Sequence, residues 1–178
     1  NKMSLKNKIG VLGGTFDPPH IGHLKISNIC LKKLKLKKVL WAITKKSPLK
    51  KSSFFSLKQR IKMSKDLTKK EKKIKVFFIE NRLNSNKTIN LVRYLKKRHD
   101  VHFIIGSDNL VNFHKWHKFQ DILKTCKLVV LSRKGFDKKA KKSVIMSPLK
   151  NKKIIFIKNK HINVSSTSIR KHLLHGSN

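Results

Sequence analysis

Short apolar runs alternate with helix-patterned segments along the chain, and this alternation constrains the fold more than any other feature. Six runs have the apolar content of buried strands, and five segments read as helices, the first of which places its apolar residues mostly on one side. The predicted strands are 8–13, 39–43, 74–79, 101–105, 128–131 and 154–157. The predicted helices are 22–34, 56–67, 88–97, 119–125 and 166–174. Such alternation predicts an α/β fold in which helices cover both faces of a mainly parallel sheet of five to six strands.

We see no linker or internal repeat, so residues 1–178 are predicted to form a single domain. Sheets of this kind bind ligands at the carboxyl ends of their strands, where the strand order reverses. The motifs described below follow the first, second and fourth predicted strands or begin the last helix. They are therefore expected to converge on one cleft.

The chain carries 45 Lys and Arg against 8 Asp and Glu, a formal net charge of +37. A nucleic-acid-binding module is the first function class that this charge suggests. However, only six of these cations are arginine, whose guanidinium is better suited to bind bases and phosphates with two parallel hydrogen bonds. The lysines occur in every segment and do not form one continuous basic surface in the sequence pattern. Compositional drift toward lysine explains this pattern better. We expect no specific nucleic-acid partner, only non-specific binding at low salt.

The sequence favours a cytoplasmic protein with no membrane partner. No run approaches the roughly 18 to 20 apolar residues that a membrane span needs. The first residues contain no apolar stretch of signal-peptide length. Cys30 and Cys126 are far apart, lack metal-type spacing and suit a reducing compartment.

The most informative stretch is residues 13–23, GGTFDPPHIGH, which follows the first predicted strand and opens the first helix. Gly13 and Gly14 allow the backbone to approach a phosphate closely, and the free amides of a helix start attract an anion. His20 and His23 share one face of the first turn, so each can donate a hydrogen bond to phosphate oxygens. The simpler alternative is a tight turn with two surface histidines. The full motif in a strand–turn–helix context favours a polyphosphate site.

A second anion-binding pattern, VSSTSIR, occupies residues 164–170. Hydroxyls and free amides at a helix start form an anion nest, and a guanidinium adds a fixed fork for phosphate oxygens. By itself the pattern also fits an ordinary capped terminal helix. Paired with the first motif, it predicts that the helix 166–174 completes the phosphate site.

Together these motifs resemble the nucleotidyltransferase superfamily that carries the HxGH signature. GGTFDPPHIGHL is very similar to the form found in bacterial nicotinate-nucleotide adenylyltransferases, and the resemblance extends over about residues 8–174. It implies a Rossmann-like nucleotidyltransferase fold. It also implies an enzyme that joins the AMP moiety of ATP to nicotinate mononucleotide, giving deamido-NAD and pyrophosphate.

The resemblance implies roles for individual residues. His20, His23 and Arg170 would be catalytic. Residues 103–110, FIIGSDNL, resemble the FxxGxDNL segment of the family, in which Gly106 would lie against the adenosine and Asp108 would accept hydrogen bonds from ribose hydroxyls. Asp108 can also serve as a helix N-cap. The implied ATP-binding set is Gly13, Gly14, Thr15, Phe16, His20, His23, Gly106, Asp108, Ser165, Ser166, Thr167 and Arg170.

The same resemblance implies contacts to the mononucleotide. Residues 113–117 resemble an F-x-x-W segment, so Trp116 would stack on the pyridine ring and His117 would help bind its carboxylate, although Trp116 can also be a core residue. Residues 41–50 resemble the WxxTxxNPLK loop, in which Lys50 would contact the nucleotide phosphates. A solvated Lys50 is the alternative in so lysine-rich a chain.

Two segments depart from the family pattern. The family's T-x-D-T aligns with residues 88–91, TINL, which keeps Thr88 as a contact near the pyridine carboxylate and leaves the choice between acid and amide substrates open. The family's RPGF aligns with residues 133–136, RKGF, and Arg133 receives no firm role. Mg²⁺ is expected to arrive with ATP, because it often binds through phosphates and water. The paucity of acids argues against a dedicated carboxylate cage, so no metal-ligating residue is assigned.

Several rival functions remain at this point. Residues 62–65 read KMSK, which together with the HIGH of residues 20–23 resembles class I aminoacyl-tRNA synthetases, but KMSK lies inside a predicted capped helix and is taken as coincidence. A nicotinamide-mononucleotide or phosphopantetheine adenylyltransferase is an alternative enzyme. A basic nucleic-acid-binding module without catalysis is the alternative from another class.

Overall fold

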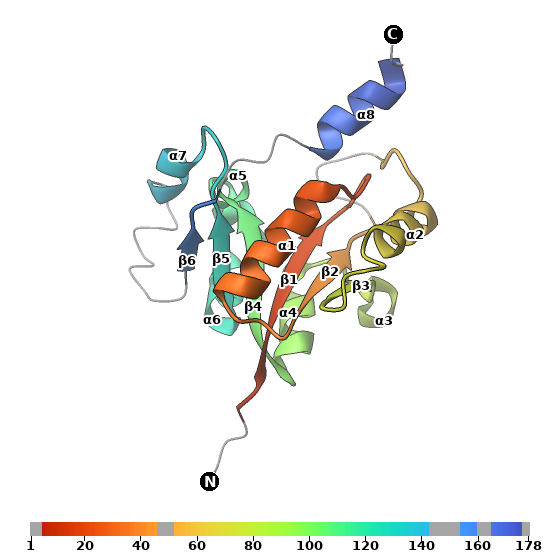
Figure 1. The fold of residues 1–178 in the computed structure, drawn as a ribbon. Helices are drawn as coiled ribbons and strands as arrows, with labels where there is room; N and C mark the ends of the chain where they lie inside the picture. The colour runs from red at the N-terminus through yellow and green to blue at the C-terminus, as the bar shows by residue number, and fades with distance from the viewer. Residues whose placement is uncertain (1–4, 46–51, 143–153, 160–164, 176–178) are drawn as a thin grey trace.

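A computed structural model describes residues 5–45, 52–142, 154–159 and 165–175. Six strands in these ranges form one sheet in the order β3-β2-β1-β4-β5-β6, and every neighbouring pair is parallel. The α/β prediction is confirmed, and each expected strand is present (Figure 1). The strands are β1 (Asn7–Gly14), β2 (Lys38–Ile43), β3 (Ile74–Phe77), β4 (His99–Gly106), β5 (Lys127–Leu131) and β6 (Ile154–Ile157).

The five predicted helices are present, with each end within one residue of its predicted position. They are α1 (Ile21–Lys33), α2 (Leu57–Leu67), α4 (Thr88–Lys96), α6 (Phe119–Thr125) and α8 (Ser166–His175). The predicted capping box of α2 is present, because Ser56 and Gln59 exchange hydrogen bonds, and KMSK lies within this helix. Four short helical segments were not predicted, because none is long enough to display helical periodicity. They are α3 (Glu80–Leu83), α5 (Ser107–Leu110), η1 (Phe113–Lys115) and α7 (Asp137–Lys141).

Helices cover both faces of the sheet, as the alternating pattern predicts. On one face, α4 and α6 bury residues such as Val92 and Ile122 against the central strands. On the other face, α1 and α2 pack on a second cluster that contains Cys30 and Trp41. The strands are therefore buried on both sides, which explains why they read as continuous apolar runs.

The strand order creates a switch point at the centre of the sheet. The chain builds β1, β2 and β3 outward in one direction and then crosses to β4 on the other side of β1. Ligands of such sheets bind outside the carboxyl ends of the strands at this reversal. The first turn of α8 lies beside the start of α1, close to the same edge (Figure 1).

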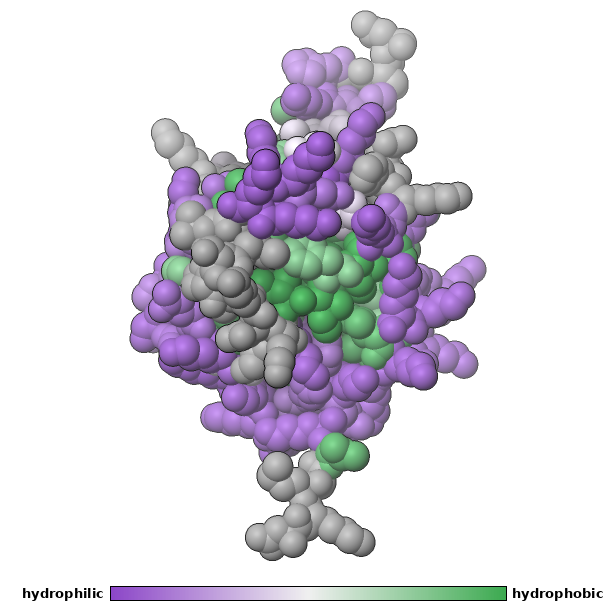
Figure 2. Space-filling model, turned by 90° about the vertical axis from the view of Figure 1, so that its left-hand side faces the viewer, coloured by the Kyte–Doolittle hydropathy of each residue, from purple (hydrophilic) through white to green (hydrophobic). Residues whose placement is uncertain are grey.

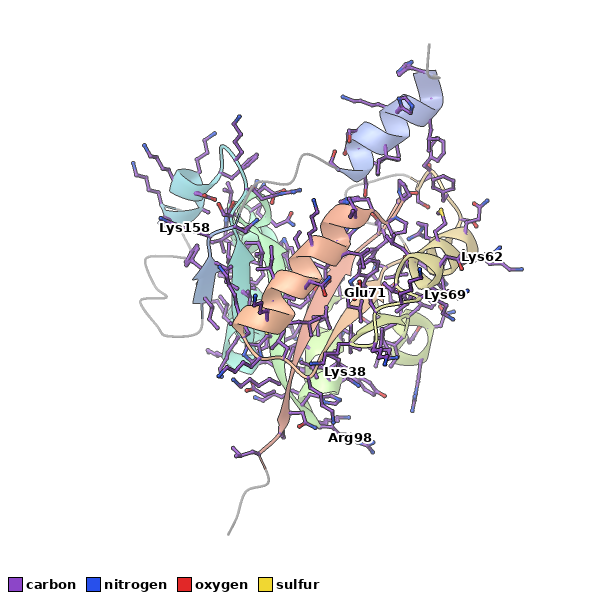
Figure 3. The ribbon with its side chains drawn as sticks, in the orientation of Figure 1. Lys38, Lys62, Lys69, Glu71, Arg98 and Lys158 are labelled. Atoms are coloured by element: carbon purple, nitrogen blue, oxygen red, sulfur yellow. The ribbon has the colours of Figure 1, made fainter. Side chains whose placement is uncertain are left out.

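Charged side chains extend from all sides of the molecule. The labelled cations Lys38, Lys62, Arg98 and Lys158 come from four separate segments and do not form one stripe (Figure 3). The side of the molecule that carries the edge strand β6 has a hydrophobic area bordered by hydrophilic residues (Figure 2), and Phe156 of this strand is 39% exposed. None of the helices in the described ranges is long and apolar enough to span a membrane.

Candidate active site

The two motif histidines are fixed by hydrogen bonds to the backbone at the start of α1. His20 is the N-cap residue, and its Nδ1 atom accepts a hydrogen bond from the Gly22 amide at 3.0 Å. Nδ1 of His23 accepts from the His20 amide at 3.0 Å. Since each Nδ1 atom is an acceptor, each neutral imidazole carries its proton on Nε2. The helix start therefore presents two N–H donors on rings whose centroids are 3.9 Å apart.

Both imidazoles are neutral at physiological pH. Burial is the main cause that lowers the pKa of His20 to about 4, and the positive charge of Arg133 lowers it further. Burial likewise lowers the pKa of His23 to about 3, with contributions from His20 and Arg133. Two neutral Nε2–H donors can bind phosphate oxygens without a change in protonation.

Aromatic packing holds His23 in place. The ring of Phe16 stacks on Trp41 with centroids 5.0 Å apart and lies 4.6 Å from the His23 ring. Nε1 of Trp41 donates to the Ser27 hydroxyl at 2.9 Å, and this hydroxyl donates to the His23 carbonyl at 2.7 Å. Phe16 is only 2% exposed and adopts a positive φ of 51°. Its side chain therefore supports His23.

The glycines and Thr15 complete the turn between β1 and α1. Gly13 and Gly14 are the last residues of β1. A Cβ atom on Gly13 would lie 3.4 Å from the Phe103 ring, so this glycine leaves room for an aromatic side chain of β4. The Thr15 carbonyl accepts a hydrogen bond from the Arg60 guanidinium at 2.7 Å.

The late serine-rich motif meets this turn directly. Nη1 of Arg170 donates to the Asp17 carbonyl at 2.6 Å, and the Ser166 hydroxyl donates to the Pro18 carbonyl at 2.8 Å. Nη2 of Arg170 also donates to the Thr167 hydroxyl at 3.2 Å. Segments about 150 residues apart in sequence therefore form one side-by-side arrangement at the carboxyl edge of the sheet.

Serine side chains cap the start of α8. The Ser168 amide donates to the Ser165 hydroxyl at 3.0 Å, and the Ser168 hydroxyl donates to the Ser165 carbonyl at 2.9 Å. The first-turn amides of a helix have no partner inside the helix and attract anions. Because this capped start lies beside the start of α1, two helix N-termini meet at one place (Figure 1).

A third group of residues follows β4 and β5. Gly106 is the N-cap of α5, which corrects the alternative that Asp108 holds this position. A Cβ atom on Gly106 would collide with Oδ1 of Asp108 and would lie 3.1 Å from Cγ of Arg133, so a side chain here would require both neighbours to shift. Nε of Arg133 lies 3.6 Å from Oδ1 of Asp108 in an ion pair.

The residues assigned to the pyridine nucleotide lie on the α4 and α6 side of the sheet. Trp116 is half-buried and packs against Phe113 and Phe103, with ring centroids 4.9 Å and 6.1 Å away. Thr88 is the half-buried first residue of α4, and His117 is exposed. Lys50 lies outside the described residues.

Comparisons with known proteins identify the family of this chain. A relative from Pelagibacter ubique named "Probable nicotinate-nucleotide adenylyltransferase" is 48% identical over 173 residues, which are 96% of each chain. A relative of the same name from Aquifex aeolicus is 32% identical over 88% of this chain and 98% of its own. A family model described as Cytidylyltransferase-like matches residues 11–172.

The chain belongs to the cytidylyltransferase-like family, and within it to the nicotinate-nucleotide adenylyltransferases. Family membership makes it an enzyme of the nucleotidyltransferase class. Among solved structures, Plasmodium falciparum nicotinic acid mononucleotide adenylyltransferase complexed with NaAD superposes with a TM-score of 0.76 at 18% identity. The match covers 94% of this chain and 84% of that one, and it shows that the two share a fold.

Arg133 is the residue at this adenylyltransferase site that sequence reasoning missed. Its positive charge acts on both motif histidines, and it pairs with Asp108. Its amide donates to the Ser107 hydroxyl at 2.8 Å and to Oδ1 of Asp137 at 3.1 Å, which fixes the backbone at this point. Its position just after β5, at the same edge as the other motifs, was the signal that could have identified it.

Proposed function

We propose that this chain transfers the adenylyl group of ATP to the phosphate of nicotinate mononucleotide, giving deamido-NAD and pyrophosphate. The meeting of the two motifs carries the proposal, because Arg170 and Ser166 of α8 bond to the turn that leads into His20 and His23. In this proposal, neutral N–H donors and a fixed guanidinium act together at the switch point of the sheet. Family membership supports the same reaction.

The reaction balances without a covalent enzyme intermediate. A phosphate oxygen of the mononucleotide attacks the α-phosphorus of ATP, a new P–O bond forms, and the bond from the α-phosphorus to the α,β-bridging oxygen breaks so that pyrophosphate leaves. The Nε2–H groups of His20 and His23 would donate to the transferring and leaving phosphates, and Arg170 and Arg133 would offset their charge. Positioning and charge stabilisation can supply the rate, because a phosphate oxygen is already a competent nucleophile.

We propose that ATP enters as its Mg²⁺ complex. The described residues contain no cluster of three or more His, Cys, Asp or Glu that is suited to hold a metal ion. Mg²⁺ commonly binds through substrate phosphates and water, with few protein ligands. The ion is therefore part of the substrate in this mechanism.

The pyridine ring is proposed to lie against Trp116. This side chain is braced on one side by Phe103 and Phe113 and is only half-buried, which leaves surface for a flat ring. Thr88 and His117 supply a hydroxyl and an imidazole for the carboxylate of the substrate. In the same proposal Asp108 binds the ribose of ATP beside Gly106.

The reaction is proposed to occur in the cytoplasm. Cys30 and Cys126 are both buried and lie far apart in the sequence, which suits a reducing compartment. Burial raises the pKa of Cys30 to about 12, so this thiol is an inert core residue.

One assay tests the function. The purified protein with Mg-ATP is offered nicotinate mononucleotide, nicotinamide mononucleotide and phosphopantetheine in separate reactions, and pyrophosphate and the dinucleotide product are measured. We expect product with nicotinate mononucleotide, slower formation with the amide and none with phosphopantetheine. Absence of pyrophosphate with both pyridine mononucleotides would overturn the proposal, and nucleic-acid binding that persists in an inactive protein would favour the binding-module alternative.

A further inference from the structure

Arg60 of α2 is a buried cation that none of the proposed catalytic steps uses. It is 1% exposed, and its guanidinium donates hydrogen bonds to four backbone carbonyls. Nη1 donates to Thr15 and to Thr44, each at 2.7 Å. Nη2 donates to Lys45 at 2.7 Å, and Nε donates to Phe55 at 3.1 Å. One side chain thus joins the turn after β1, the segment after β2 and the start of α2.

Asp17 fastens the same turn from its other end. Its carboxylate is 2% exposed and accepts hydrogen bonds from the amides of Phe54 and Phe55 at 2.6 Å and 2.8 Å. Its carbonyl accepts from Arg170. The residue that receives the α8 guanidinium is therefore tied to the segment before α2.

Glu80 of α3 completes the arrangement on the β2 side. It accepts from the Thr44 hydroxyl at 2.6 Å and from the Lys45 amide at 2.8 Å. Burial lowers the pKa of Arg60, and the negative charges of Asp17 and Glu80 oppose this change. The two nearby carboxylates favour the charged form of the buried guanidinium, and its hydrogen bonds go to the four backbone carbonyls.

We propose that Arg60 is a positioning residue that sets the place of the phosphate-binding turn, residues 15–20, and through it the catalytic donors. Glu80 accepts from the Thr44 hydroxyl, and Arg60 donates to the carbonyls of both Thr44 and Thr15. From Thr15 the turn continues through Asp17, which accepts from Arg170, to His20. This inference depends on the proposed function, because it assigns Arg60 to the alignment of phosphates in that reaction.

The geometry demands a guanidinium in particular. Three of its nitrogens reach four carbonyls from three segments, whereas a lysine ammonium is a single point with three donors. Arg60→Lys should therefore keep a positive charge and lose the fixed spacing between the segments. The side chain touches no substrate in this proposal, so its loss should reduce kcat more than the affinity for ATP.

The experiment compares wild type, Arg60→Lys and Arg60→Met with the control Arg93→Met. Arg93 is half-exposed and makes one ion pair with Asp121 at 3.9 Å, remote from the turn. We expect kcat to fall about 100-fold in Arg60→Lys, as misplaced reacting groups produce. The calorimetric Kd for Mg-ATP should stay within about threefold, because Arg60 itself makes no contact with ATP in this proposal. Arg93→Met should behave as wild type.

Hydrogen exchange separates this inference from the proposed function. Wild-type turnover establishes the reaction independently, whereas the amides of Lys45, Phe54 and Phe55 report on the hydrogen bonds around Arg60 whether or not the reaction occurs. We expect these amides to lose protection in Arg60→Lys. Unchanged kcat in a folded Arg60→Lys, unchanged protection, or an ATP Kd that rises in proportion to the fall in kcat would each overturn the proposal.

A second variant covers the case in which the Arg60 variants do not fold. Glu80→Gln removes a charge and one acceptor from the same arrangement, while Arg60 keeps its carbonyl partners. We expect a smaller fall in kcat, about tenfold, with lower protection of the Lys45 amide. Wild-type kcat and wild-type protection in this variant would overturn the proposal.

Discussion

Arginines at the carboxyl ends of the strands are held by hydrogen bonds or an ion pair, whereas cations at the amino ends are mostly lysines directed into solvent. Three of the six arginines, and four of the eight acids, lie at the carboxyl edge. They are Arg60, Arg133, Arg170, Asp17, Glu80, Asp108 and Asp137. In a chain with 45 cations, the few acids and arginines mark the site better than positive charge does.

At the amino ends of the strands, positive charge is present without rigidly held donors. A shallow depression of about 400 Å³ lies there, lined by Lys6, Arg93, Lys96, Lys97 and Thr125. Nζ of Lys6 donates an exposed hydrogen bond to the Lys96 carbonyl at 2.7 Å. A hollow surrounded by flexible cations attracts any polyanion through its charge, but it has no rigid donors to align a reacting phosphate.

The largest difference in kcat between variants at the carboxyl ends and variants at the amino ends is expected for the motif histidines. His23→Ala or His20→Ala should lower kcat by about 10²–10³-fold, because each variant removes one preorganised donor to the transferring phosphates. Pyrophosphate release at saturating Mg-ATP measures this. The control is His99→Ala at the start of β4, which should leave kcat unchanged in the folded protein. Equal losses in the His23 and His99 variants would remove the distinction between the ends.

A smaller effect is expected for the arginine that follows β5. Arg133→Met should lower kcat about 30-fold, because the variant removes a positive charge that we propose to offset the charge of the phosphates, while the helix-start donors remain. Pyrophosphate release measures this too. The matched control is Arg98→Met, which removes an arginine near the amino ends and should preserve kcat. Wild-type kcat in Arg133→Met would show that Arg133 serves only to hold Asp108.

The fold could largely be predicted from the sequence because its strands and longer helices obey simple periodicities. Buried parallel strands read as apolar runs, and Ser56 and Gln59 indicated the start of α2. The two phosphate motifs could also be predicted, since each combines a helix start with anion-binding residue types. Their meeting through Arg170 and Asp17 followed from the parallel topology.

Other features depend on tertiary contacts that no local pattern encodes. Arg60 looks like any surface cation of a helix, and only the fold reveals that three separate segments converge on it. Phe16 is assigned to ATP by its place in the motif, yet its side chain packs under His23. His20 was expected on the first turn of α1, whereas in the structure it is the N-cap residue. At the N-cap its Nδ1 atom accepts from the Gly22 amide, so the neutral ring carries its proton on Nε2.

Histidine titration sharpens the comparison further. Burial is the largest cause of the lowered pKa of His20, His23 and His99, but four cations near His99 add to the effect, namely the half-buried Lys38 and the exposed Lys37, Arg98 and Lys6. Raising the salt concentration from about 0.05 to 0.5 M should therefore raise the pKa of His99 more than that of His23, since salt screens exposed charges best. Nuclear magnetic resonance of the imidazole Cε1 protons, assigned with the alanine variants, measures this.

Protonation also sets a stability window. The pKa values of His20 and His23, about 4 and about 3, lie below the ordinary 6.5, so the unfolded chain binds these protons first as pH falls. The histidine contribution to stability is complete above pH 6.5 and is lost as pH falls through 4 toward 3. Thermal unfolding at about pH 7 and about pH 5 should show a smaller drop in Tm for His23→Ala than for wild type. A larger drop in the variant would contradict the assigned pKa direction.

The smallest effect on turnover is expected where the charge is greatest. Replacement of Lys6, Lys37, Lys38 and Lys97 by Gln together removes four cations from the amino ends and should change kcat by less than about twofold, because these side chains touch no catalytic group and their distant charges are screened at about 0.15 M salt. The same variant should bind duplex DNA more weakly, with the slope of log K against log salt reduced by about 0.9 for each phosphate that the variant no longer neutralises. A large fall in kcat with unchanged DNA affinity would contradict this prediction. The lysines at the amino ends of the strands would then act on the reaction and not on non-specific binding of polyanions.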